Sequence, residues 1–140
     1  MAGSVTITYS PPSAFAKWVA WTWTSDGSGD VSGTDTKSLD GQVMRWATNP
    51  SATAPSSNYD IEVNDEDGLD LAAGGLVNRH TSNSEQVIPG GDGDPGAMFN
   101  GPLSLVVSNG GAAKIGTLTL YYVEKHKEEQ CLIRRQLSSR

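Results

Sequence analysis

Residues 15–23, Phe-Ala-Lys-Trp-Val-Ala-Trp-Thr-Trp, decide the fold, because large side chains alternate there with small and polar ones. A period of two is typical of a β-strand, whose successive side chains point to opposite faces of a sheet. One face of this strand holds Phe15, Lys17, Val19, Trp21 and Trp23. Trp18 lies on the opposite face, so we expect a strand that is covered on both sides, at least in part.

Seven further segments show strand patterns bounded by turn residues. They span residues 4–9, 42–48, 58–64, 69–71, 84–88, 103–108 and 114–124. Asp65-Glu66-Asp67-Gly68 predicts a hairpin of 58–64 with 69–71, and Ser108-Asn109-Gly110-Gly111 is the strongest hairpin connector in the chain. About eight short strands at this spacing predict an all-β fold, either an antiparallel β-sandwich or a jelly roll.

Glycine and proline divide the chain into two parts. The 140 residues include 16 Gly and 7 Pro, and none of these follows Gly116. From Lys125 onward, helix-forming residues dominate. We therefore expect one β-domain, residues 1–123, and a C-terminal extension of helical character, residues 124–140, called the arm below.

The arm also differs from the body in charge. Its net charge is +2, against −8 for residues 1–123. One interpretation is a frayed surface tail, and the other is a segment that docks on a neighbouring subunit. The candidate interface residues are Leu132, Ile133, Leu137, Arg134 and Arg135. Because the body is poor in aliphatic residues, burial against a partner would supplement its core, and we expect a homo-oligomer.

Composition argues against several classes of partner. The isoelectric point near 4.7 disfavours duplex DNA, whose binding depends on clustered Lys and Arg. No apolar stretch approaches the ~20 residues of a membrane-spanning helix, and the first residues lack a secretory signal. The single cysteine, Cys131, excludes an intramolecular disulfide. We expect a protein made in a cytoplasm, with neither nucleic acid nor a membrane as its direct partner.

Two motifs suggest cofactors but fail their spacing tests. Asp65-Glu66-Asp67-Gly68 resembles a calcium loop, yet the first ligand position falls on Val63, which has no side-chain oxygen. Gly91, Gly93 and Gly96 match a dinucleotide-binding string, but Pro95 leaves no room for the helix that must follow it. Asp26 with Asp30 and Asp92 with Asp94 read as acidic turns. We predict no metal and no nucleotide cofactor.

Catalytic signals are sparse. The chain has only two histidines, His80 and His126, so a metal site would also need carboxylate ligands. A Ser–His–Asp triad through His80 is an open alternative, although the sequence has no G-x-S-x-G motif to support it. We expect that the protein is not an enzyme.

The indoles of Trp18, Trp21 and Trp23 allow two interpretations, a buried core or a flat platform for sugar rings.

Several segments taken together are similar to a known class of protein. They are residues 21–33, 45–50, 54–55, 58–61, 65–68, 78–79, 101–105, 108–111 and 116–122. This succession of turns and strands, over about residues 5–123, resembles small structural proteins of tailed bacteriophages and prophages. The resemblance implies a non-enzymatic virion component (head decoration, neck or tail-associated) that contacts capsid, neck or tail subunits and is made in the bacterial host cytoplasm. The alternative is a carbohydrate-binding β-sandwich module.

Overall fold

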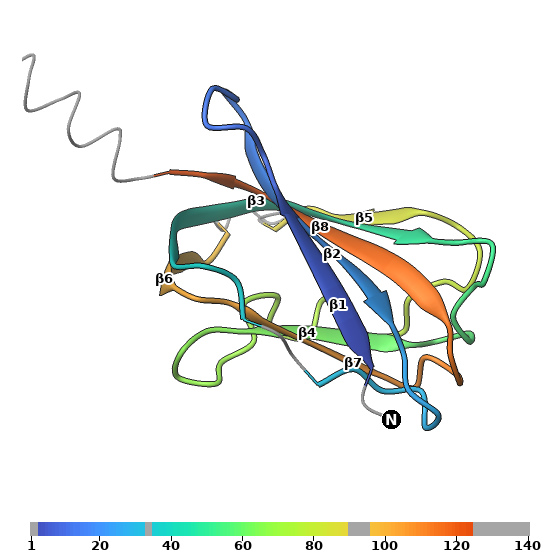
Figure 1. Ribbon diagram of the computed structural model, residues 1–140. Coiled ribbons are helices and arrows are strands. Elements are labelled where there is room, and N and C mark those ends of the chain that lie inside the picture. The colour runs from blue at the N-terminus through green and yellow to red at the C-terminus, as the bar shows by residue number, and fades with distance from the viewer. Residues whose placement is uncertain (1–2, 33–34, 90–95, 125–140) are drawn as a thin grey trace, which may run out of the picture.

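The computed structural model describes residues 3–32, 35–89 and 96–124, and every regular element within them is a β-strand (Figure 1). In chain order they are β1 (Ser4–Tyr9), β2 (Lys17–Thr24), β3 (Leu39–Pro50), β4 (Asp60–Asn64), β5 (Glu85–Val87), β6 (Met98–Gly101), β7 (Ser104–Ser108) and β8 (Ile115–Val123). The predicted all-β class is confirmed. Among the described residues we find no helix whose length and hydropathy would let it cross a bilayer.

The strands form two antiparallel layers that face each other (Figure 1). In the larger sheet the order is β1-β2-β8-β3-β5, and β6 pairs with another part of β3. The smaller sheet consists of β4 and β7, and isolated bridges at Val31–Val107 and Tyr59–Arg79 widen it. The protein is therefore a β-sandwich with antiparallel pairing throughout its named strands.

One hydrophobic cluster fills the space between the layers. Its members come from the inward faces of both sheets and include Trp21, Trp23, Trp46, Ile61, Val63, Leu105, Val107, Leu118 and Leu120, each at most 1% exposed. The ring of Trp23 in the larger sheet packs on Tyr59 beside the smaller one, with 5.6 Å between ring centroids. The alternation of residues 17–23 thus places Val19, Trp21 and Trp23 where the two layers meet.

The predicted hairpin of residues 58–64 with 69–71 is present only in part. One antiparallel bridge joins Asn64 to Asp70, and the Leu71 N–H donates to the Val63 carbonyl at 2.8 Å, whereas the full ladder of β4 is with β7. The carboxylate of Asp70 explains the difference, because it accepts hydrogen bonds from the N–H groups of Val63 (3.2 Å), Ala72 (3.1 Å) and Gly74 (2.9 Å). These local bonds bend the chain into turns and compete with strand pairing.

The connection after β7 also differs from the predicted hairpin. β7 lies in the smaller sheet, whereas β8 lies between β2 and β3 in the larger one, so the chain crosses from one layer to the other. The hydroxyl of Ser25 holds the crossing loop by donating to the Gly111 carbonyl and accepting from the Lys114 N–H at 2.9 Å. Asn109 and Gly111, with φ of 61° and 81°, provide the left-handed turns.

Candidate interaction site

The outer face of the larger sheet carries an aromatic and cationic row at one end. Strand register places Trp18 of β2 opposite Tyr121 of β8, and Tyr121 opposite Arg45 of β3. The guanidinium carbon of Arg45 lies 4.6 Å from the centroid of the Tyr121 ring, which is a cation–π distance. This contact fixes the Tyr121 ring, and Trp18 stays half-buried beside it.

A β-bulge adds Met44 to the same face. The pairing of β3 with β8 shifts register between Val43 and Arg45, so Met44 is the extra residue. Val43 and Trp46 point into the core at 1% exposure each, and the bulge lets both intervening side chains turn outward. Met44 is 50% exposed as a result.

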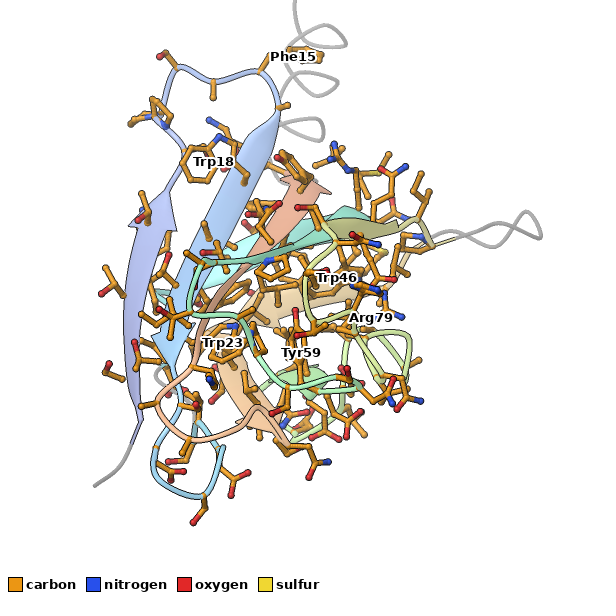
Figure 2. The ribbon with its side chains drawn as sticks, turned by 90° about the vertical axis from the view of Figure 1, so that its right-hand side faces the viewer. Phe15, Trp18, Trp23, Trp46, Tyr59 and Arg79 are labelled. Atoms are coloured by element: carbon orange, nitrogen blue, oxygen red, sulfur yellow. The ribbon has the colours of Figure 1, made fainter. Side chains whose placement is uncertain are left out.

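The loop between β1 and β2, residues 10–16, presents Phe15 to solvent. Its base is closed by the Ser10 N–H donating to the Trp18 carbonyl (2.9 Å) and by the Trp18 N–H donating to the Ser10 hydroxyl (3.1 Å). Lys17, only 8% exposed, donates from its ammonium group to the Pro12 carbonyl at 2.7 Å. These bonds brace a short loop with a large aromatic side chain near its end (Figure 2).

Phe15 corrects the face assignment made from the sequence. The alternating pattern places it inward with Val19 and Trp21, but its side chain is fully exposed, at 104% of the reference area. The reason is that β2 begins at Lys17, so the strand period does not reach Phe15. A fully exposed phenylalanine on a braced loop is unusual enough to need an explanation.

Phe15, Met44 and Tyr121 contribute to the lining of a groove of about 550 Å³ near the start of β2 and the end of β8, whereas Trp18 and Arg45 lie outside that lining. Its lining is Ala14, Phe15, Ala16, Lys17, Met44, Tyr121, Tyr122, Val123 and Glu124. Most of this surface is apolar, whereas Leu69, Ile88 and Met98, which are also exposed, lie outside it. We call it the apolar groove. Clustered exposed apolar side chains of this kind mark binding surfaces.

The three tryptophans of the predicted sugar platform do not share a surface. Trp21 and Trp23 are both 0% exposed, and Figure 2 shows Trp23 beside Tyr59 in the interior. Their indole N–H groups have no hydrogen-bond partner within the described part of the chain. No ligand can stack on these two rings, so Trp18 on the outer face is the one member left for such a role.

The predicted interface residues of the arm, Leu132, Ile133, Arg134, Arg135 and Leu137, lie outside the described residues. The described chain ends at Glu124, which itself lines the apolar groove. The residues that sequence reasoning missed are Phe15 in its exposed role, Met44, Arg45 and Val123. In the sequence, the one sign of this site is Met44, a large apolar residue directly before the charged Arg45, which interrupts the alternation of its strand.

A second, polar pocket of about 340 Å³ lies between the end of β1 and the start of β3. The Lys37 ammonium group lies 4.4 Å from the centroid of the Tyr9 ring, and the Lys37 N–H donates to the Tyr9 hydroxyl at 2.9 Å. Burial raises the pKa of Tyr122 to about 12, and the nearby carboxylates of Glu124 and Asp40 add to this. Tyr122 is a neutral phenol at physiological pH. The contacts between Lys37 and Tyr9 join β1 to the chain before β3.

His80 is engaged as a local cap. Its Nδ1 accepts hydrogen bonds from the N–H groups of Ser82 (3.0 Å) and Asn83 (2.9 Å). In a Ser–His–Asp triad this nitrogen must instead donate to a carboxylate. The Glu85 carboxylate accepts from the His80 backbone N–H at 2.7 Å and lies 3.8 Å from the Arg79 guanidinium. The surroundings of His80 therefore organise a turn and do not match a triad.

The acidic turns use their carboxylates internally. Asp26 accepts from the N–H groups of Ser28 (2.8 Å) and Asp30 (2.9 Å), and these bonds hold the pKa of Asp26 below its usual value. Asp65 accepts from Asp67 and Leu69 in the same manner, at 2.9 and 3.0 Å. Within residues 3–32, 35–89 and 96–124, no group of three or more His, Cys, Asp or Glu side chains is placed to hold a metal ion. Asp92 and Asp94 lie outside these ranges.

Comparison with known proteins gives distant structural similarity. No protein-family model matches the sequence, and no curated protein matches it significantly. A solved structure described as a carbohydrate-binding module of the β-sandwich superfamily, with promiscuous specificity, is 16% identical with a TM-score of 0.39. That alignment covers 89% of this chain and 54% of the other, so this chain spans about half of its length. A cupin domain from Bordetella pertussis aligns at 10% identity and a TM-score of 0.32, covering 88% of this chain and 98% of the other. Neither similarity indicates what this chain binds.

Proposed function

We propose that this protein is a non-enzymatic structural component of a tailed-phage virion, where it acts through contacts between subunits. The observation that supports the proposal best is the apolar groove with Phe15 at its edge. Phe15 is fully exposed, yet the loop that carries it is braced by Lys17, which is itself almost completely buried. An aromatic ring that an ordered loop holds in solvent contributes a favourable free energy only when a partner covers it.

The sequence resemblance supports the virion setting, and the acidic body is consistent with contacts to protein rather than to DNA. A virion accessory protein needs no active site, since its role is to increase the contact area between subunits. In this proposal the protein occurs in several copies per particle and contacts capsid, neck or tail proteins. It is made in the cytoplasm of the bacterial host and is then incorporated into the particle.

Quantitative mass spectrometry of gradient-purified particles tests this proposal. Particles from a culture that carries the gene should contain the protein in multiple copies. Phe15→Asp should lower its copy number at least tenfold, whereas Thr6→Asp, an exposed change on the edge strand β1, should leave it unchanged. Absence of the unmodified protein from purified particles would contradict the proposal.

A second candidate function, binding of a carbohydrate, rests on the row of Trp18, Tyr121 and Arg45. These side chains are adjacent by strand register and combine aromatic rings with a guanidinium donor, the groups that suit a sugar ring. A glycan array that shows saturable binding, lost in Trp18→Ala and kept in Thr6→Ala, would favour this role. If the array shows no such binding, the subunit-contact function explains these exposed side chains better.

A further inference from the structure

We propose that the apolar groove of one copy binds the segment Cys131–Leu137 from the arm of a second copy. This inference rests on the proposed function and specifies the partner, which is another molecule of the same chain. Each copy would donate one arm and accept one. Because a groove and an arm are different surfaces, the contact is of the head-to-tail type unless two copies exchange arms reciprocally.

The chemistry of the two surfaces is complementary. The groove offers Phe15, Met44 and Val123 as exposed or half-exposed apolar side chains. The arm holds the apolar residues Leu132, Ile133 and Leu137 among polar ones. Ile133 and Leu137 are four residues apart, so a helical segment presents them on one face, as a groove requires.

The position where the described chain ends favours a second copy over the chain's own arm. Glu124 lines the groove, so the arm starts at the groove's edge. Residues 125–131 (Lys-His-Lys-Glu-Glu-Gln-Cys) contain no Gly, Pro, Asn or Asp, and so lack the usual turn formers. Over the eight residues from Glu124 to Leu132 a helix advances about 12 Å and a strand about 26 Å. Since the sequence offers no turn that would fold the apolar residues back onto the chain's own groove, the groove of a neighbour is the site we infer for them.

Charge favours contact between an arm and a body without selecting the copy. The arm has a net charge of +2 and the body has a net charge of −8, so an arm is attracted to the body of its own chain and to that of another copy. Arg134 and Arg135 stand between the apolar residues of the segment and carry part of this charge. Neighbouring bodies repel each other, and an inserted arm offsets part of that repulsion.

The single cysteine allows a direct test in the full-length protein. Cys131 adjoins Leu132, and Met44 lies in the groove at 50% exposure, where a cysteine is tolerated. Oxidation of Met44→Cys with diamide should join Cys131 of one copy to the new cysteine of another. On a non-reducing gel, covalent dimers and larger products should exceed those of Thr6→Cys at least fivefold. Unmodified protein measures the background from Cys131 pairs, and peptide mapping identifies the linkage.

The outcomes separate the alternatives. Intermolecular linkage between positions 44 and 131 supports the inference. A monomer with an internal disulfide would show that the groove holds the chain's own arm, and cross-linking no greater than in Thr6→Cys would show that the arm does not enter the groove. Either result overturns the inference. The copy number in particles is measured separately, so the proposed function can survive that failure.

Discussion

Gly116 provides a sensitive test of how the core packs around Trp23. It lies on β8 opposite Trp23 of β2, and a Cβ atom at this position would stand 2.6 Å from Cζ2 and 2.9 Å from Cε2 of the Trp23 ring. The ring cannot move aside, because Trp23 is 0% exposed and packs on Tyr59. The φ of Gly116 is not in the left-handed region, so the backbone itself accepts alanine.

We therefore expect Gly116→Ala to lower the free energy of unfolding through crowding alone. Overpacking a core costs about 1–3 kcal/mol, and replacing a strand glycine by alanine returns about 0.5–1 kcal/mol, which leaves a net loss of about 1 kcal/mol at the midpoints and at most about 2.5 kcal/mol. Gly27→Ala is the matched control, because no atom lies within 4 Å of a Cβ at that position. Urea unfolding followed by far-ultraviolet circular dichroism gives both values.

The double variant makes the test specific. Trp23→Phe removes the outer part of the indole that meets the new methyl group, and it also removes an N–H that has no partner among the described residues. In this background Gly116→Ala should be neutral or stabilising, which corresponds to a coupling energy of about 1–3 kcal/mol. If the two substitutions are additive, the Trp23 ring does not lie against β8 and the described core is wrong.

Three further predictions concern titration and the braced loop. Burial raises the pKa of Tyr122 from 10.0 to about 12, so the stability that this side chain contributes should be complete below pH 10 and should fall between pH 10 and about 12. In Tyr122→Phe the midpoint of urea unfolding should depend less on pH in that window. The Asp26 carboxyl, which accepts from two backbone N–H groups, should titrate by NMR below 3.8. The protection of the Asp30 and Ser28 amides against exchange, relative to the intrinsic rate at each pH, should fall as pH falls through that lower pKa. Lys17→Met should release the Pro12 carbonyl and speed proteolysis of the loop at Phe15, while Lys37→Met should not.

The local pattern was sufficient to predict most of the strands but not all of their partners. Alternation located β2, β4 and β8 closely, because a half-buried strand must alternate and these segments have a period of two. Pairing depends on contacts distant in sequence, so the local pattern predicted the short contact of β4 with residues 69–71 but not its longer ladder with β7. β6 was missed because its four residues offer one buried aromatic side chain, Phe99, and no detectable period.

The candidate site was less accessible to sequence reasoning than the core. Trp21 and Trp23 were expected in the core or in a platform, and burial decides for the core. The apolar groove depends on where β2 begins and on the bulge at Met44, and both are set by tertiary pairing. If β2 began two residues earlier, Phe15 would point inward with Lys17 and Val19, and without the bulge Met44 would share the inward parity of Trp46.

The molar mass of the full-length protein in solution, measured by light scattering across a concentration series, shows whether the chain associates through the apolar groove. We expect the 140-residue chain to associate as its concentration rises, and Phe15→Asp and Ile133→Asp each to keep it at the 14.8 kDa monomer. Thr6→Asp, which changes charge on the same sheet away from the apolar groove, should associate like the unmodified protein. A monomer at every concentration, or association unaffected by Phe15→Asp, would contradict the claim that this protein works through contacts at the apolar groove.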